Sequence, residues 1–240
     1  PPRSTLFPYT TLFRSQRGFD QIVHDVCLMD LPVVFAIDRA GIVGNDGETH
    51  QGVYEISFLR FIPNMVLLAP RDEKTLELSL EFAYTCPHPC AVRYPRGSYE
   101  TLEFAPTTFE MGKSELLKEG LDDILFIGYG TGVTKAINTA KLIDKDIAIL
   151  DLRFVKPLDG EMLENLSHKY KNWYVFSDSQ KQGGVGSAIV EFLSQKQITD
   201  IKLTSFEYDD IFIQHGDTKD VEKDLGVTPE QISQRIINNE

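Results

Sequence analysis

The stretch LPVVFAIDRAGIVGNDGETHQG, residues 31–52, joins a short apolar run to a glycine-rich polar loop. Residues 31–37 have the length and composition of a buried strand. The loop that follows contains an Asp–Arg pair, repeated glycines and a single histidine. Ligands of open α/β sheets bind at the loops that follow the carboxyl ends of strands. The stretch therefore predicts an α/β fold with a binding loop after this strand.

Strand-like and helical segments alternate on both sides of that loop. In the first part of the chain we expect strands at residues 31–37, 65–69 and 90–94, and helices at 16–28, 54–60 and 72–85. In the second part we expect strands at 123–128, 147–152, 173–177 and 201–206. We expect one helix directly after a glycine turn at 128–132, and further helices at 160–168, 183–193 and 229–238. Such alternation is typical of βα units and of a parallel sheet.

Two domains are expected, joined by a polar linker. Residues 16–100 form the first domain, residues 101–120 form a linker with some strand content, and residues 121–240 form the second domain. Residues 1–15 repeat Thr-Leu-Phe, contain no acidic residue and lack the composition of a secretory signal. We expect this segment to be non-native and disordered, so it stands outside the fold prediction.

Composition excludes several classes of partner. The 240 residues are 42% hydrophobic and 25% charged, which is typical of a globular protein, and they carry a formal charge of −12. We expect no binding to nucleic acid or to an anionic membrane, because little net cationic charge is available to neutralise phosphate groups. Apolar runs stay shorter than the ~18 residues that a membrane span needs. The three cysteines are sparse, which predicts the reducing cytoplasm as location.

Two short motifs have structural explanations. Residues 128–132, GYGTG, follow a predicted strand but lack the G-x-G-x-x-G register of a dinucleotide site, so a tight strand-to-helix turn is expected. Cys86 and Cys90 flank Pro-His-Pro, a spacing that invites comparison with metal sites. Because no second ligand pair is near in sequence, we expect a helix-end turn with buried or half-buried thiols and no metal site.

Individual residues of two loops are the candidates for phosphate binding and proton transfer. Arg39 can bind a phosphate or carboxylate, and His50 can transfer a proton near neutral pH. A second basic loop, VRYPRG at residues 92–97, also follows an apolar segment. Arg96 stands between a proline and a glycine, so the chain turns there and the side chain projects. Two guanidinium groups suit a phosphate, with Arg93 inside the strand as the weaker candidate.

The motifs together resemble one enzyme family. IDRAGIVGNDGETHQG, AVRYPRG, DLRFVKPLD and GGVGSAIVEFL, at residues 37–52, 91–97, 151–159 and 183–193, are similar to the carboxyl-terminal part of the 1-deoxy-D-xylulose-5-phosphate synthase family, which are thiamine-diphosphate enzymes of the transketolase superfamily. The resemblance covers essentially everything after residue 15. It implies a partial thiamine-pyrimidine-binding domain with a parallel sheet, followed by a transketolase C-terminal-like α/β domain. One departure, Asp178-Ser179 in place of the usual acidic pair, predicts a weaker interdomain or dimer contact.

The resemblance implies roles for five residues of this chain. His50 is expected to be catalytic, beside the aminopyrimidine and the substrate, with a proton-transfer or hydrogen-bonding role. Arg39, Asp46 and Arg96 are expected in the substrate pocket, with the two arginines on the phosphate of the acceptor aldehyde. Arg17 matches a position near the pyrimidine ring of the cofactor.

The resemblance also implies an activity. In the family, pyruvate is decarboxylated and condensed with glyceraldehyde 3-phosphate, the first step of non-mevalonate isoprenoid precursor biosynthesis and a source of thiamine and pyridoxal. The enzyme is a homodimer with thiamine diphosphate and Mg²⁺ as cofactors. The carboxylate that activates the cofactor and the GDG-type motif for diphosphate and magnesium belong upstream of residue 16. We therefore expect this chain alone to be inactive and, with sheet edges exposed, poorly soluble.

Other interpretations stay open. The chain is also compatible with a non-catalytic dimerising α/β module, with one subunit of a split transketolase-like enzyme, and with the β subunit of a 2-oxo acid dehydrogenase. The intact loops argue against lost function, and the unusual first fifteen residues favour truncation over a natural split. The two arginines and the THQG loop favour the synthase over the dehydrogenase subunit.

Overall fold

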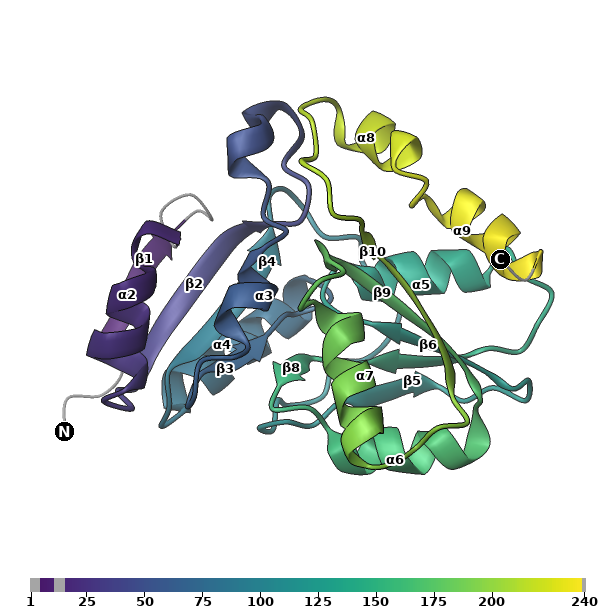
Figure 1. The fold of residues 1–240 in the computed structure, drawn as a ribbon, viewed down its shortest axis with the longest axis horizontal. Coiled ribbons are helices and arrows are strands. Elements are labelled where there is room, and N and C mark those ends of the chain that lie inside the picture. Colours follow the sequence, from purple (N-terminus) through teal and green to yellow (C-terminus); the bar gives the residue numbers. More distant parts are fainter. Residues whose placement is uncertain (1–4, 11–15, 239–240) are drawn as a thin grey trace.

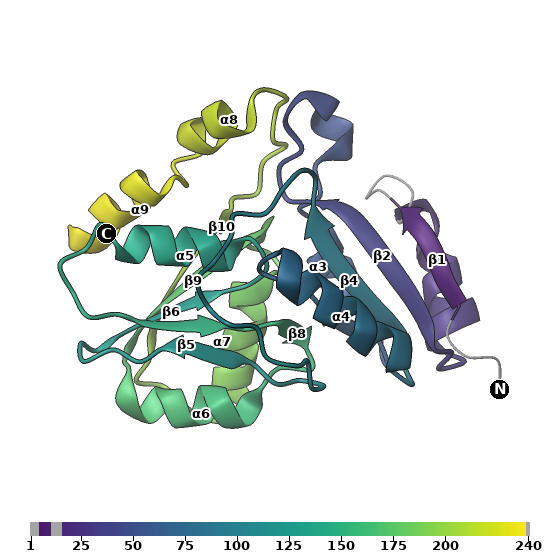
Figure 2. The same ribbon diagram turned by 180° about the vertical axis from the view of Figure 1, so that it is seen from behind.

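The computed structural model describes residues 5–10 and 16–238, and within them the chain forms two five-stranded sheets with helices packed on their faces (Figure 1). Seen from both sides, α2 and α4 lie on opposite faces of the first sheet (Figure 2). Helices α5 and α7 cover opposite faces of the second sheet, and α8 and α9 run along its upper side. Each sheet is therefore the middle layer of an α/β sandwich, as the alternation predicts.

The first sheet has the strand order β1-β2-β4-β3-β8. Its strands are β1 (Thr5–Thr10), β2 (Val33–Ala40), β4 (Cys90–Pro95), β3 (Val66–Leu68) and β8 (Phe154–Lys156). The first four are parallel, and β8 pairs antiparallel with β3. Because β8 comes from the second half of the sequence, that half contributes a strand to the sheet of the first half.

The second sheet has the order β10-β9-β6-β7-β5. Its strands are β10 (Lys202–Tyr208), β9 (Asn172–Gln180), β6 (Ile124–Gly128), β7 (Ala148–Asp151) and β5 (Glu115–Lys118). The first four are parallel, and β5 pairs antiparallel with β7 at the edge. The strand content expected in the linker is therefore an edge strand of this sheet.

The described helices follow the predicted positions, with short additions in the loops. They are α2 (Phe19–Gln21), the π-helix η1 (Ile22–Cys27), the 3₁₀ turns η2 (Gly44–Asp46) and η3 (Glu48–His50), α3 (Glu55–Leu59), α4 (Glu73–Thr85), α5 (Gly132–Ala140), α6 (Gly160–Lys169), α7 (Val185–Gln195), α8 (Thr218–Asp224) and α9 (Pro229–Ile237). Sequence signals explain several ends. Helix α4 begins at a capping box made by Asp72 and Thr75, and α9 has Pro229 in its first turn after the cap residue Thr228.

The expectation of disorder over residues 1–15 is not met where the structure describes this segment. Thr5–Thr10 form β1, and the registers Thr5↔Val33 and Phe7↔Phe35 place it parallel to β2. The physical reason is edge pairing, since β2 otherwise presents unpaired N–H and C=O groups. Residues 1–4 and 11–15 lie outside the described residues.

One apolar core spans both sheets. The largest cluster of buried residues includes Ile37 and Leu67 from the first sheet and Ile127 and Val175 from the second. Two sheets that share a core hold their relative positions, because separating them would expose apolar surface to water. The loops at the sheet junction therefore rest on a fixed support.

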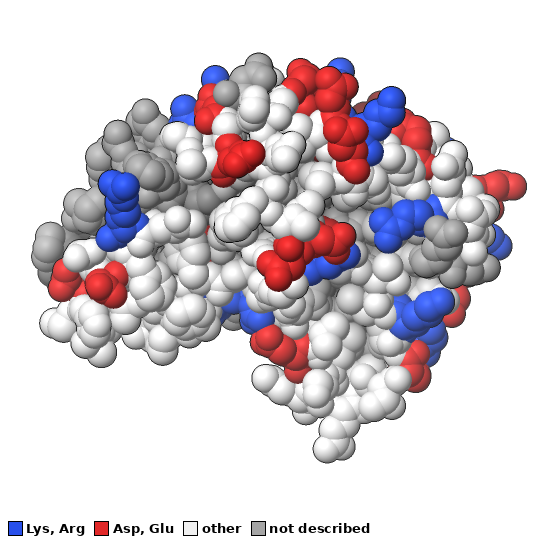
Figure 3. Space-filling model, turned by 45° about the horizontal axis from the view of Figure 1, so that its top comes forward, with Lys and Arg blue, Asp and Glu red and all other residues white. Residues whose placement is uncertain are grey.

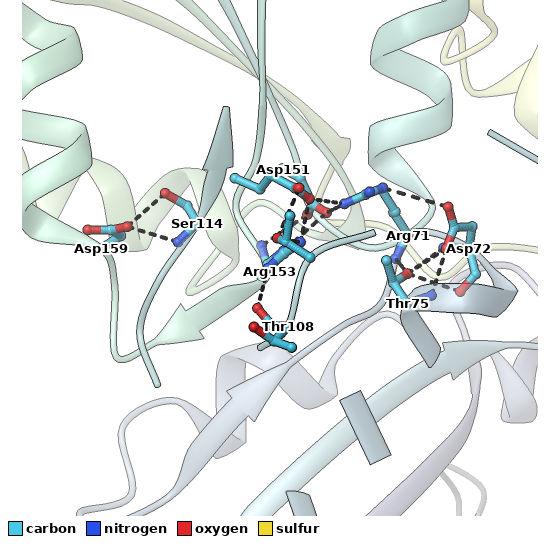
Figure 4. Close-up of polar contacts among 10 residues, drawn as sticks. Arg71, Asp72, Thr75, Thr108, Ser114, Asp151, Arg153 and Asp159 are labelled. Carbon is cyan, nitrogen blue, oxygen red and sulfur yellow. Dashed lines mark hydrogen bonds and ion pairs between the residues drawn. The ribbon is translucent and has the colours of Figure 1, made fainter. Parts of the chain in front are cut away.

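Buried ion pairs also connect the two sheets (Figure 4). Arg71 follows β3, its side chain is 0% exposed, and its Nη1 donates to Asp151 Oδ2 at the end of β7 at 2.8 Å. Arg153 lies against the same carboxylate, with its backbone N–H 3.1 Å from Asp151 Oδ1, and its Nη1 donates to the carbonyl of Thr108 at 3.1 Å. This cluster is a structural junction, since each charged group is matched by an opposite one.

Candidate functional site

The binding loop leaves β2 and returns to α3 through a narrow neck. Gly41 and Gly52 form an isolated bridge in which the two N–H groups donate to the facing carbonyls at 2.6 and 2.8 Å. A Cβ on Gly52 would lie 1.8 Å from the carbonyl oxygen of Arg39, which no side chain could tolerate. The glycine is therefore required for the close approach of the two loop ends.

Arg39 has an unusual backbone at this neck. Its φ is +62°, in the left-handed region that costs a non-glycine residue about 1–3 kcal/mol. Such strain persists only where the surrounding structure holds the backbone in place, and here the Gly41–Gly52 bridge holds the chain just after Arg39. The backbone geometry sets the direction in which the guanidinium of Arg39 leaves the strand.

Three predicted residues meet in one ion-pair cluster. Arg39 Nε donates to Asp46 Oδ2 at 3.1 Å, and Arg96 Nη1 donates to Asp46 Oδ1. Arg39 also pairs through Nη1 with the neighbouring Asp38. Asp46 comes from the 3₁₀ turn η2, whereas Arg96 directly follows β4, so two loops from adjacent strands converge on one carboxylate.

The electrostatics of this cluster follow from its geometry. The hydrogen bond from Arg39 lowers the pKa of Asp46 below its usual 3.8, and the same bond raises the pKa of Arg39. Burial raises the pKa of Asp38. The side chains of Arg39 and Arg96 remain 25% and 51% exposed, so both guanidinium groups stay within reach of solutes. A phosphate that displaced the carboxylate of Asp46 could accept hydrogen bonds from both guanidinium groups.

His50 lies in the same loop, at the end of the 3₁₀ turn η3. Its Nδ1 is 3.0 Å from Thr49 Oγ1, and its backbone N–H donates to Gly47 at 3.1 Å. The residue is half-buried. The hydroxyl orients the ring, and two consecutive 3₁₀ turns bring His50 and Asp46 onto one short loop.

Arg17 lies in a different segment. It is exposed and precedes α2, the helix that packs beside the first two strands (Figure 1). The structure thus joins three of the five predicted residues in one cluster and places His50 in the same loop as Asp46, whereas Arg17 stands in the segment before α2.

The loop is also fastened to the second half of the chain by Gln51, which the sequence did not single out. The side chain of Gln51 is buried, its Oε1 accepts from the N–H of Val43 at 2.9 Å, and its Nε2 donates to the carbonyl of Gln214 at 3.2 Å. The segment that leads into α8 therefore lies beside the loop (Figure 1). His215 belongs to this segment and is exposed. The sequence offers one signal for Gln51, which is a polar residue between His50 and Gly52.

Arg93, the weaker phosphate candidate, is buried and paired with carboxylates, so its guanidinium is not accessible to a phosphate. It is 1% exposed, its Nε donates to Glu55 Oε1 at 2.9 Å, and its Nη1 donates to Asp178 Oδ1. Its Nη2 donates to the carbonyl of Gly52 at 3.2 Å, which supports the neck of the loop. Asp178 comes from β9, so its ion pair with Arg93 is an interdomain contact despite the lost acidic pair, and its Oδ2 also accepts from Thr131 Oγ1 of the second domain at 2.8 Å.

A cavity of about 340 Å³ adjoins the cluster. Its lining includes Ala40, Arg96, Tyr99, Thr131, Lys135 and Asp178. Arg96 therefore stands between Asp46 and a solvent-filled space at the junction of the two sheets. On the face drawn in Figure 3, Lys and Arg side chains occur as separate groups among acidic ones rather than as one continuous basic surface.

Within residues 5–10 and 16–238, no three His, Cys, Asp or Glu side chains are grouped so that they could hold a metal ion. In the same part of the chain, every helix is too short or too polar to cross a membrane.

Two protein families match this chain. Residues 4–101 match the family described as transketolase, pyrimidine binding domain, and residues 112–232 match the family described as transketolase, C-terminal domain. The first match begins within the segment that was expected to be non-native. Residues 102–111, between the two matched ranges, fall within the polar stretch that was expected to be the linker.

Relatives of high identity carry one name. A 1-deoxy-D-xylulose-5-phosphate synthase from Aliarcobacter butzleri (strain RM4018) is 65% identical over 231 residues, which are 95% of this chain and 38% of the relative. The enzyme of the same name from Sulfurimonas denitrificans is 55% identical over 232 residues, with the same two coverages. The chain therefore spans 38% of the length of these relatives.

A solved structure agrees in fold. The chain described as split gene transketolase, inactive beta4 tetramer, aligns with a TM-score of 0.85 and 24% identity over 98% of this chain and 75% of that chain. At this identity the likeness concerns the fold alone. Together with the family matches over both halves, these comparisons show that the chain belongs to the transketolase family, of which it has the pyrimidine-binding and C-terminal domains.

Proposed function

We propose that this chain is the pyrimidine-binding and C-terminal part of a 1-deoxy-D-xylulose-5-phosphate synthase, a transferase. The proposed reaction is the decarboxylation of pyruvate and the condensation of the two-carbon unit with glyceraldehyde 3-phosphate, at the start of non-mevalonate isoprenoid biosynthesis. The 65% identity to a synthase over 95% of the chain supports this over a non-catalytic module or a split-enzyme subunit.

The observation that carries the proposal is the position of Asp46 between two guanidinium groups. Arg39 donates to one oxygen of the carboxylate at 3.1 Å and Arg96 donates to the other. In this proposal the carboxylate neutralises the arginines until the phosphate of the acceptor aldehyde arrives. The phosphate then takes the two guanidinium donors, because a dianion with three oxygens accepts more charge-assisted hydrogen bonds than a carboxylate does.

We propose that His50 donates a proton to the aldehyde oxygen of the acceptor substrate. The bond that forms between the two substrates turns this oxygen into an alkoxide, which a nearby imidazolium can protonate. The Thr49 hydroxyl, 3.0 Å from Nδ1, limits the rotation of the ring. The glycines of the loop let the backbone approach the substrate closely.

The described residues do not by themselves fit the whole cofactor that the family implies. They contain no metal-holding group of carboxylates and histidines, and only Arg17 and His50 among them are proposed to lie near the pyrimidine ring. Thiamine diphosphate, when bound, supplies the electron sink for decarboxylation. We propose that the site for its diphosphate and Mg²⁺ lies on sequence beyond this chain, which leaves the chain inactive alone. The parent protein is proposed to be a cytoplasmic homodimer.

The proposal is tested by completing the enzyme. The chain is joined to the preceding part of the Aliarcobacter butzleri synthase, and pyruvate consumption is measured with and without glyceraldehyde 3-phosphate. We expect turnover that needs the aldehyde and falls when Arg96 is replaced by Met. The matched control is Arg235→Met in α9, which leaves both loops unchanged. A folded chimera that does not use glyceraldehyde 3-phosphate would contradict the proposed reaction.

A further inference from the structure

The turn between α4 and β4 holds two thiols in one apolar cluster. Cys86 is the C-cap residue of α4, and Cys90 is the first residue of β4. They are 4% and 0% exposed and belong to the same cluster as Val34 and Leu68. The three residues between them include two prolines, whose fixed φ angles limit the conformations of the turn. Both thiols therefore belong to one short, restricted turn and to one apolar cluster.

The two thiols interact directly and differ in character. The pKa of Cys86 is affected chiefly by a hydrogen bond with the thiol of Cys90, and further by one with the backbone of His88. These bonds lower the pKa of Cys86 to about 7, whereas the bond to Cys86 and burial raise the pKa of Cys90 well above its usual value. Cys27, in another cluster, has a pKa raised to about 11 by burial. Cys86 is thus the nucleophile of the pair at neutral pH.

Cys86 lies just below the surface of the turn. Its neighbours Thr85 and Pro87 are exposed, and it sits where α4 ends. Helix ends open locally at low free-energy cost, so opening this last turn uncovers the sulphur without unfolding the sheet. His88 Nδ1 lies 2.8 Å from Asp30 Oδ1, which ties the turn to the loop before β2. Local opening at this end of the helix would let a small reagent reach Cys86 without global unfolding.

We propose that Cys86 and Cys90 are a reversible dithiol–disulfide pair that is oxidised by low-molecular-weight disulfides. The Cys86 thiolate attacks one sulphur of the reagent, forms a mixed disulfide and releases one reagent thiolate. Cys90 then gives its proton to solvent and attacks the Cys86 sulphur, which releases the second reagent thiolate. Two protein thiols lose two electrons in total, and one reagent disulfide is reduced to two thiols.

The bond would join the end of α4 to the start of the strand that leads to Arg96. Cys90 pairs with Val34 and Val66 in the middle of the first sheet, so the anchor on the strand side is rigid. On the other side, Cys86 stands at the end of α4. This thiol chemistry does not depend on whether the two loops bind a phosphate.

Oxidised glutathione tests the proposal on the full chain under native conditions. We expect the loss of two of the three thiols, a mass lower by two hydrogens, a digest in which Cys86 and Cys90 are linked, and full reversal by dithiothreitol. The Cys90→Ser variant should stop at one glutathione on Cys86, and the Cys86→Ser variant should not react. Cys27→Ser is the control and should still lose two thiols.

Circular dichroism before and after the reaction shows whether the fold is retained. If Cys86 and Cys90 stay reduced in the folded chain and react only in denaturant, the proposal is wrong. Glutathione accumulating on Cys86 of the unaltered chain, without closure to Cys90, would also overturn it.

Discussion

Arg93 of β4 and Asp178 of β9 form a buried ion pair that joins the two sheets at the neck of the binding loop. Arg93 also donates to the carbonyl of Gly52 at 3.2 Å, and Asp178 lies so close to Gly41 that a Cβ there would be 2.8 Å from Oδ2. The pair therefore connects the C-terminal domain with both ends of the loop. The proposed substrate loop is supported by both domains rather than by its own domain alone.

Replacing Arg93 should lower the free energy of unfolding. Arg93→Met leaves Glu55 and Asp178 as buried carboxylates without their partner, which typically costs about 3–5 kcal/mol of unfolding free energy. Urea unfolding followed by circular dichroism measures the loss. The control is Lys196→Met, which breaks an exposed pair with Glu164 and should cost about 0–1 kcal/mol. Equal effects of the two substitutions would show that the buried pair does not stabilise the junction.

The neck should not accept a side chain at Gly52. In Gly52→Ala the new Cβ meets the carbonyl oxygen of Arg39 at 1.8 Å, so the loop ends must separate and Arg39 must move. We expect phosphate binding to weaken about tenfold or more, which corresponds to about 1.4 kcal/mol. Gly226→Ala is the control, because it imposes a positive φ of 70° with nothing within 4 Å. It should lower stability and leave phosphate binding unchanged; an unchanged affinity in Gly52→Ala would disprove the role of the neck.

The charge state of Asp46 should depend chiefly on Arg39. The hydrogen bond from Arg39 lowers the folded-state pKa below 3.8, so the ion pair stabilises the loop above about pH 3.8 and is lost as the pH falls through that lower value. A carboxyl ¹³C NMR titration should therefore give a midpoint below 3.8. Arg39→Met should raise the midpoint more than Arg96→Met does. A midpoint that neither substitution changes would exclude the bridging geometry.

Alkylation should separate the three thiols. Since the pKa of Cys86 is about 7 and that of Cys27 is about 11, the rate at Cys86 should rise to half its maximum near pH 7, while Cys27 stays slow up to pH 9 or so. Peptide mapping after short pulses of iodoacetamide measures both rates. If Cys27 reacts as fast as Cys86 at pH 7, the hydrogen bond from Cys90 does not activate Cys86.

The first strand should matter for solubility. β1 covers the edge of the eight-residue strand β2, so deletion of residues 1–15 exposes a row of unpaired backbone groups. We expect the shortened chain to aggregate, which light scattering after size-exclusion chromatography detects. A monodisperse shortened chain would instead favour the view that these residues are a non-native extension.

The sequence predicted the sheets best where apolar runs are uninterrupted. Residues such as Leu67, Ile127 and Val175 stand in such runs and are buried as expected. β8 was missed because Phe154–Lys156 is a three-residue strand whose partner, β3, is distant in sequence. Local patterns carry no information on such a pairing.

Two features of the site illustrate what local signals leave out. The loop residues of the cluster stand in recognisable motifs, but the partner of Arg93 lies 85 positions away. Gly184 and Gly186 of GGVGS leave room for Glu207 of β10, whose carboxylate accepts from the N–H groups of Val185 and Gly186 at 2.7 and 3.0 Å. A Cβ on Gly184 would lie 2.5 Å from that carboxylate, which only the folded arrangement reveals.

The most direct measurement is a calorimetric titration of the chain with glyceraldehyde 3-phosphate and, separately, with inorganic phosphate. Each guanidinium contributes charge-assisted hydrogen bonds worth about 1.5–3 kcal/mol, so Arg39→Met and Arg96→Met should each weaken binding about tenfold or more. Arg235→Met in α9 should bind as the unaltered chain does. Binding that persists unchanged in both loop variants, or that falls equally in Arg235→Met, would contradict the proposed phosphate site between Arg39 and Arg96.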